Sequence, residues 1–346
     1  MTLKKILGAA GLAAALAALG GCAEKKPTLH IYTWSDYIKP ELVQQFEREN
    51  NCKVVIDTYD SNEAMYAKLK AGATGYDLLF PSSYMVKIMN DQGMLQKLNL
   101  DLLPNRTNID PDYMKLAIDR DMDHSVPYTV TITCLGYLGS KVPDFKPSWG
   151  MLDREDLKGR MTMLNDHREV IGSALKYLGY SLNTLDDQQL AEAKQVVLRW
   201  KKNLAKFENE QYKNGLASGE FLLVHGYSGD LMLVQSENED IQIAVPEEGS
   251  QINFDDMVIP VGAPQPELAH KMINFILAPQ SAAELTEFIY FLCPNLPSYA
   301  LLSEEVRSDP ILFPPAEVVA KLETLSDLGE NNVKYTKLWD EIKAGE

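Results

Sequence analysis

Residues 29–37 read Leu-His-Ile-Tyr-Thr-Trp-Ser-Asp-Tyr, and this stretch decides the fold. Its apolar start, 29–33, predicts a buried strand that ends at Trp34, Asp36 and Tyr37. An amphipathic helix with Pro40 in its first turn is predicted directly afterwards. The rings and the carboxylate therefore follow a strand end, which is where open α/β sheets bind ligands. Aromatic faces and a carboxylate suit an organic cation, although a packed Trp beside a solvated acid explains this stretch alone equally well.

Patterns typical of strands and helices alternate along the rest of the chain. Further strands are predicted at 52–58, 76–80, 160–164, 221–225 and 241–245. Helices are predicted at 40–50, 61–71, 83–91, 112–119, 168–178, 186–205, 210–217, 229–236, 266–277, 280–290, 316–325 and 331–344. Two β-rich runs, 126–137 and 253–260, separate the two βα series.

We therefore expect an α/β fold with two lobes, each a mostly parallel sheet flanked by helices. The two β-rich runs would cross between the lobes and act as a hinge that closes them on a ligand. The expected division is a linker at 23–27, lobe 1 over 28–131 plus 257–300, and lobe 2 over 132–256 plus 301–346.

The first 22 residues have the features of a lipoprotein signal peptide. Lys4 and Lys5 precede an apolar stretch too short to span a membrane, and Leu19-Gly20-Gly21-Cys22 resembles a bacterial lipobox. We expect export, cleavage before Cys22 and lipidation of its thiol, which would anchor the protein to a membrane facing the periplasm or cell surface. A plain signal peptide with an incidental cysteine is the alternative. The three other cysteines, at 52, 134 and 293, allow one disulfide whose pairing the sequence does not give.

Charge and motifs exclude several classes of function. With 33 basic and 49 acidic residues the net charge is −16, which argues against a nucleic-acid partner and is compatible with a cationic ligand. The sequence has no CxxC, HExxH, GxGxxG after a strand, or GxxxxGK[ST], so no metal or cofactor is expected. Gly226-Tyr227-Ser228-Gly229 fails the GxSxG pattern because Asp230 replaces the last glycine. We expect no enzyme; a hydrolase using Ser228 and His225 is the alternative.

Acids and rings recur where predicted strands meet helices. The candidate ligand-binding residues are Trp34, Asp36, Tyr37, Ser82, Tyr84, Asp166, Glu169, Tyr227, Asp230 and Asp255. A buried ammonium must be paired and hydrogen-bonded, so a diamine site needs an acid near each end and apolar walls between. Each acid also has a structural interpretation: Asp166 and Glu169 form a capping-box pattern, and Asp230 suits the positive end of a helix dipole.

The ordered motifs resemble those of the spermidine/putrescine-binding proteins of bacterial ABC importers, a branch of the periplasmic binding proteins. The resemblance covers nearly the whole chain after the signal. The motifs that carry it are Tyr32-Thr-Trp34-Ser-Asp-Tyr37, Asp77-Leu-Leu-Phe-Pro81-Ser82-Ser-Tyr84, Val126-Pro-Tyr128, Asp166-His-Arg-Glu-Val170, Tyr227-Ser-Gly-Asp230, Phe254-Asp255 before Ile259-Pro260, and Pro294-Asn295.

The resemblance implies a two-lobed receptor that traps a linear polyamine and delivers it to a permease driven by an ATPase. It implies a monomer without a cofactor, in which the candidate residues line the cleft and Phe291 adds an aromatic wall. Tyr227 stands where the family usually has Trp. Asn253 replaces an aromatic ring, Leu325 falls near a Gln of spermidine-type members, and Asp230 matches putrescine-type members.

These departures favour putrescine over spermidine. Another amine, an amino acid or a zwitterion stays open as the ligand, as does a sensor role in place of transport.

Overall fold

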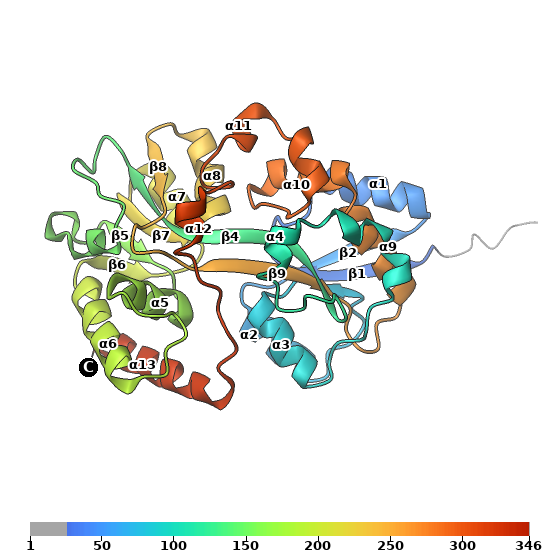
Figure 1. Cartoon of the computed structure of the whole chain (residues 1–346), viewed down its shortest axis with the longest axis horizontal. Helices are drawn as coiled ribbons and strands as arrows, with labels where there is room; N and C mark the ends of the chain where they lie inside the picture. The colour runs from blue at the N-terminus through green and yellow to red at the C-terminus, as the bar shows by residue number, and fades with distance from the viewer. Residues whose placement is uncertain (1–25, 346) are drawn as a thin grey trace, which may run out of the picture.

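The computed structural model describes residues 26–345, so the predicted signal peptide and Cys22 lie outside the described residues. Within them, nine strands form a sheet in the order β2-β1-β3-β9-β4-β7-β5-β6, with β8 paired to β4. Figure 1 shows helices packed around two halves of this sheet, with β4 and β9 running between the halves. The α/β fold with two lobes is confirmed.

One half is built on three short parallel strands: β1 (Thr28–Thr33), β2 (Lys53–Thr58) and β3 (Leu78–Leu79). Its helices are α1 (Pro40–Asn50), α2 (Asn62–Lys70), α3 (Ser83–Asp91), α9 (Pro266–Ile276) and α10 (Pro279–Ile289). The fully buried Leu29, Ile31 and Phe80 pack with Phe46 of α1 and Met272 of α9. This apolar core fixes where the β1 and β3 ends present their side chains.

The other half contains β5 (Met161–Met163), β6 (Leu204–Phe207), β7 (Leu223–Tyr227) and β8 (Ile241–Ala244). Its helices are α5 (His167–Tyr177), α6 (Asp187–Lys201), α7 (Gln211–Ser218), α8 (Ser228–Glu237) and α13 (Asn332–Ala344). Trp149, Trp200 and Tyr335 fill its core without exposure to solvent. The C-terminal helix α13 packs against α5 and α6, so the chain ends in this half.

Two long strands connect the halves: β4 (Ser125–Leu138) and β9 (Ile252–Val258). The two strands pair antiparallel from Ser125↔Val258 to Ile132↔Ile252. Beyond this, β4 pairs with β7 and β8 of the second half, while β9 reaches β3 of the first at Leu79↔Val258. Both predicted crossing strands are therefore present, hydrogen-bonded to each other.

Three predicted helices were too long. The helix predicted at 186–205 ends at Lys201, because Leu204–Phe207 joins the sheet as β6 in parallel pairing with β5. The helix predicted at 316–325 is only α12 (Ala316–Val319), because Glu323 pairs in extended conformation with Gln251. The predicted third strand shrinks to β3, and the helix at 112–119 shrinks to α4 (Pro111–Met114). The short α11 (Glu304–Arg307) was not predicted.

The three cysteines of the described part, Cys52, Cys134 and Cys293, are free and buried. No helix within residues 26–345 combines the length and apolarity needed to cross a bilayer.

Candidate functional site

Asp255 of β9 is the best-organised carboxylate between the two halves. Tyr37 Oη donates a hydrogen bond to Asp255 Oδ2 at 2.6 Å, and Ser82 Oγ donates to Oδ1 at 2.6 Å. Tyr37 follows the β1 end and Ser82 is the N-cap residue of α3, so β1 and β3 bring both donors to this carboxylate. Burial raises the pKa of Asp255 and the two hydrogen bonds oppose that shift.

We call Asp255 with its partners Tyr37 and Ser82 the Asp255 cluster. A β-bulge sets the position of this cluster. Pro127 of β4 pairs with Asp256 and Thr129 pairs with Asp255, so Tyr128 is the extra residue. Proline lacks the N–H that a regular ladder needs and is tolerated at such a bulge. The Tyr128 hydroxyl donates to the Tyr37 carbonyl at 2.5 Å. The hydroxyls of Thr129 and Tyr37 lie 2.5 Å apart, so the bulge joins β4 to the Asp255 cluster.

The two crossing strands share one polar face. Side chains alternate along a strand, so Thr129, Thr131 and Thr133 of β4 lie on the same face as Gln251, Asn253 and Asp255 along β9. We call these six residues the polar ribbon face. Thr129 pairs with Asp255 and Thr131 with Asn253. Of the six, sequence analysis selected only Asp255 as a ligand residue and noted Asn253 as a departure. The period-2 polarity of 129–133 and 251–255 was the available signal.

Glu169 of α5 is attached to the polar ribbon face. Thr133 Oγ1 donates to Glu169 Oε2 at 2.8 Å. Gln251 Nε2 and Asn253 Nδ2 both donate to Oε1, at 2.7 and 3.0 Å. Only 4% of the Glu169 surface is exposed. Burial and the neighbouring Asp166 charge raise the pKa of Glu169 to about 8, against the effect of these hydrogen bonds.

Asp166 caps α5. Its Oδ1 accepts hydrogen bonds from the Arg168 and Glu169 backbone N–H groups, at 2.7 and 3.2 Å. Its Oδ2 accepts no hydrogen bond from the described residues and is the free acceptor of this carboxylate. The capping-box interpretation is therefore right for Asp166 but wrong for the Glu169 side chain, which bonds to the crossing strands.

Aromatic side chains from both halves surround these acids. Trp34 donates its Nε1–H to the Phe80 carbonyl at 2.9 Å. Phe291 packs edge-on against Tyr37, with ring centroids 6.0 Å apart. A Cβ added at Gly229 would lie 2.7 Å from the Phe291 ring, so glycine is needed where α8 meets that ring. Phe291 thus contacts both halves.

Tyr227 and Tyr84 lie near several of these acids. Burial raises the pKa of Tyr227 well above its ordinary value, with further contributions from the charges of Glu169, Asp166 and Asp255. Burial likewise raises the pKa of Tyr84, to which the Glu63 and Asp166 charges add. The structure therefore brings Tyr84, Asp166, Glu169, Tyr227 and Asp255 together at the boundary between the halves.

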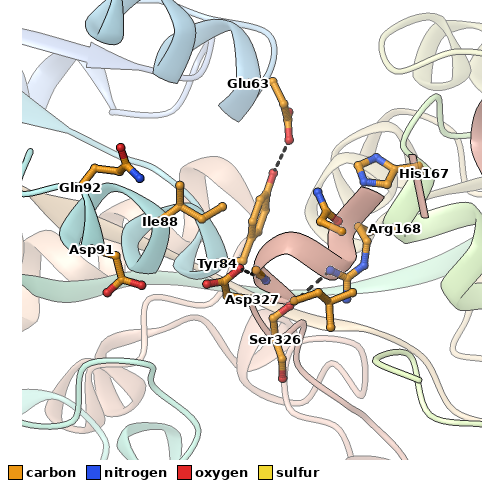
Figure 2. Close-up of a pocket in the computed structure, with 12 residues that line it drawn as sticks. Glu63, Tyr84, Ile88, Asp91, Gln92, His167, Arg168, Ser326 and Asp327 are labelled. Carbon is orange, nitrogen blue, oxygen red and sulfur yellow. Dashed lines mark hydrogen bonds between the residues drawn. The ribbon is translucent and has the colours of Figure 1, made fainter. Parts of the chain in front are cut away.

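Two cavities adjoin this group. One of about 460 Å³ is lined by Ser82, Tyr84 and Asn253, and further by Ser83, Lys87, Leu116, Ala117, Ile118, Arg120, Ile252, Phe254, Thr324, Leu325, Ser326 and Asp327. We call it the larger cavity. The other, of about 310 Å³, lies between α3, the start of α5 and residues 326–332. Figure 2 shows Tyr84 hydrogen-bonded to Glu63 on one side of this smaller cavity, with Arg168 opposite.

Two predicted ligand residues lie outside these contacts. Asp36 is exposed, has a left-handed backbone with φ 54°, and makes no hydrogen bond within the described residues. Asp230 accepts a hydrogen bond from Tyr212 Oη at 2.5 Å, and Lys213 Nζ lies 3.4 Å away. The structure does not join either acid to the Asp255 cluster.

Ser228 and His225 do not form a nucleophile–base pair. The Ser228 hydroxyl lies 3.0 Å from Thr131 Oγ1 and accepts from the Ile132 N–H. His225 packs against Trp149, and burial lowers the pKa of His225 to about 3. Among residues 26–345, no group of three His, Cys, Asp or Glu side chains is arranged to hold a metal ion.

Comparison with known proteins places these features in one family. Residues 41–314 match the family described as bacterial extracellular solute-binding protein. The chain is 36% identical to the spermidine/putrescine-binding periplasmic protein of Escherichia coli (strain K12), covering 99% of this chain and 98% of that protein. It is 35% identical to the putrescine/cadaverine-binding protein of Pseudomonas aeruginosa, covering 99% of each. The solved TpPotD lipoprotein of Treponema pallidum superposes with a TM-score of 0.84 at 33% identity, over 91% of this chain and 99% of that one.

Proposed function

This chain belongs to the bacterial extracellular solute-binding proteins, in the branch of the spermidine/putrescine-binding proteins, and from that premise we propose that it captures a polyamine for an ABC importer. The family consists of solute-binding receptors and is not an enzyme class. Within the polyamines, we propose putrescine as the preferred ligand and the boundary between the lobes as its binding site.

The observation that carries the proposal is the Asp255 carboxylate held by Tyr37 and Ser82. Each carboxylate oxygen has two lone pairs, so Asp255 keeps acceptor capacity for an ammonium after accepting two hydrogen bonds. Asp166 Oδ2 offers a second acceptor, from the N-cap of α5. The rings of Trp34, Tyr37, Tyr84, Tyr227 and Phe291 provide walls for methylenes and cation–π contact. Tyr37 and Ser82 of the first lobe hold Asp255 on the crossing strand, so a diamine that pairs with both Asp255 and Asp166 favours closure.

The larger cavity supports the putrescine preference. Asn253 and Leu325, the two positions that depart from spermidine-type members, both line it. Its other walls mix apolar and polar side chains, and its cations Lys87 and Arg120 outnumber its single acid, Asp327. A third ammonium that extends into this cavity would lose hydration and meet more positive than negative side chains, which is costly.

The remaining parts of the proposal concern the receptor as a whole. We propose that Cys22 carries the lipid anchor, that the monomer hands its ligand to a permease and its ATPase, and that the lobes divide at 28–131 plus 257–300 and 132–256 plus 301–346. A sensor role would use the same ligand site, and a neighbouring permease gene separates the two roles.

An amino acid or zwitterion is the second class of ligand, and it needs a cation for its carboxylate. Arg168, the basic residue among the cleft motifs, is already bonded to Asn183 Oδ1 at 2.8 Å and stacks on Tyr335. This arrangement favours an amine without a carboxylate.

Calorimetric titration of the purified protein with putrescine, spermidine and cadaverine tests the proposal. We expect heat and a thermal shift with putrescine, and weaker binding of spermidine. No heat and no thermal shift with any of the three amines would refute polyamine binding, and mass spectrometry of ligand released from the purified protein would identify the alternative.

A further inference from the structure

We propose that Gln251 and Asn253 are specificity-determining residues: by donating to Glu169 they withdraw this carboxyl group from the ligand, which leaves Asp166 and Asp255 as the two carboxylates of the site and so selects a diamine. This inference rests on the proposed function and concerns how the same site discriminates a diamine from a longer polyamine.

First, Glu169 already accepts hydrogen bonds from three side chains. Both amide groups can only donate through their nitrogens, so Glu169 Oε1 must be an acceptor that receives two N–H groups. Gln251 Nε2 also donates to Asn253 Oδ1 at 2.8 Å, which fixes the two amides relative to each other. Thr133 occupies Oε2. Three of the four acceptor sites of Glu169 are therefore filled, and an ammonium could reach the fourth, on Oε2, only in a side chain that is 4% exposed.

The second step is the charge of Glu169. Its raised pKa of about 8 means that the carboxyl is mostly protonated at pH 7. A neutral carboxyl still fits the donors, since Oε1 accepts from both amides while the Oε2 proton points to Thr133 Oγ1. It gives little electrostatic attraction to an ammonium. Asp166, which caps α5 nearby, keeps Oδ2 as an acceptor at this end of the site.

The third step follows from the position of Asn253. It lies between Glu169 and the larger cavity, which reaches Ser82 beside Asp255. An amine longer than a diamine would meet the uncharged Asn253 amide at this point. A charge placed at residue 253 would therefore supply the missing partner of a third ammonium.

The variant Glu169→Gln tests whether the Glu169 carboxyl group pairs with the ligand. Its carbonyl can accept from Gln251 and Asn253, and its amide can donate to Thr133, so the network is retained. We expect the putrescine Kd to stay within about threefold of wild type. We also expect the proton release on binding at pH 7, from calorimetry in two buffers of different ionisation enthalpy, to match wild type within about 0.2 protons, because a ligand that paired with Glu169 would expel its proton.

The variant Asn253→Asp tests whether the number of carboxylates in the site sets its preference for a diamine. We expect the spermidine affinity relative to that of putrescine to rise about tenfold, the effect of one added charge-assisted hydrogen bond. Asn253→Leu is the matched control of similar size without charge. Gln251 and Thr133 still donate to Glu169 in this variant and keep it withdrawn, so the ratio should stay within about threefold of wild type.

Each outcome decides the inference. A tenfold loss of putrescine binding in a folded Glu169→Gln protein would overturn it, as would an extra proton released by wild type. An unchanged ratio in Asn253→Asp, or an equal rise in Asn253→Leu, would also overturn it. If Glu169→Gln fails to fold, Asn253→Asp and the wild-type proton release still decide. Wild-type protein that binds no amine refutes the proposed function itself, a result distinct from all of these.

Discussion

At the scale of single residues, hydrogen-bond partners separate the acids of this chain into three kinds. Asp255 and Asp166 keep acceptor capacity at the lobe boundary. Glu169 is buried and accepts three hydrogen bonds, and Asp36 is exposed without partners among the described residues. The same residue type in a similar strand-to-helix position therefore serves different purposes, which charge alone does not reveal.

The first prediction concerns Asp255 and Asp166. Asp255→Asn and Asp166→Asn should each weaken putrescine binding about tenfold or more, since each removes a charge-assisted hydrogen bond of roughly 1.5–3 kcal/mol. Asn caps helices as well as Asp, so the second change leaves α5 capped. Titration calorimetry measures both.

Asp36→Asn is the matched control for these two changes, because Asn tolerates the left-handed backbone at this exposed position. It should bind within about twofold of wild type. Wild-type affinity in Asp255→Asn and Asp166→Asn would show that the amine binds elsewhere.

The second prediction concerns pH and stability. Buried carboxyls with raised pKa values, about 8 for Glu169 and about 7 for Asp256, hold protons in the native state that the unfolded chain has already lost. Stability should therefore fall as pH rises towards 8. The lowered pKa of His225 has the opposite sign but acts only below its unfolded value of about 6.5.

Urea unfolding between pH 6.5 and 8 measures this effect. Glu169→Gln should remove roughly 1–2 kcal/mol of the decline, whereas Asp256→Asn should remove only the part that ends near pH 7. Parallel declines in wild type and Glu169→Gln would contradict the raised pKa of Glu169.

At the scale of elements, the sequence allowed most helices and strands to be predicted, because apolar periodicity is strong where an element packs on one face. The helix predicted at 40–50 and the structure's α1 have the same ends, set by Pro40 and by Asn51 in a left-handed cap. Leu204–Phe207 was missed because its strand character comes from pairing with β5, a partner some 40 residues away in sequence. The polar ribbon face was missed for a related reason: strand pairing brings its two triplets together.

The third prediction tests the close contact between α8 and Phe291. Gly229→Ala would place a Cβ 2.7 Å from the Phe291 ring and force that ring away from Tyr37. We expect a destabilisation of about 1–3 kcal/mol, typical of overpacking, together with weaker putrescine binding. Unfolding by urea and calorimetry measure the two effects.

Gly139→Ala serves as the comparison for Gly229→Ala. Its Cβ would come closest to the flexible Gln242 side chain, at 3.3 Å, so a small adjustment accommodates it. Equal effects of the two substitutions on amine affinity would contradict a role of Phe291 in the site.

At the scale of the whole molecule, a net charge of −16 creates a field that attracts cations. The fourth prediction is that the association rate of putrescine falls severalfold as sodium chloride is raised from about 20 to about 500 mM, because salt screens this field. The dissociation rate should change less, since both acids are only partly exposed to solvent and its salt. Stopped-flow fluorescence, with the cleft aromatics as probe, measures both rates; an association rate independent of salt would rule out steering by the net charge.

The connection between the lobes is a hydrogen-bonded ribbon that itself carries Asp255. A hydrogen-bonded pair of strands bends and twists far more readily than its strands slide. We therefore expect the ribbon to act as the hinge when the two lobes move apart. Residues close to a hinge are displaced least, and residues far from it are displaced most. Asp166 and Tyr227 would therefore leave the amine early, and Asp255 would hold it longest. On the proposed function, capture would run in reverse: one ammonium would dock at Asp255 first, and the moving half would then close on the other end of the amine.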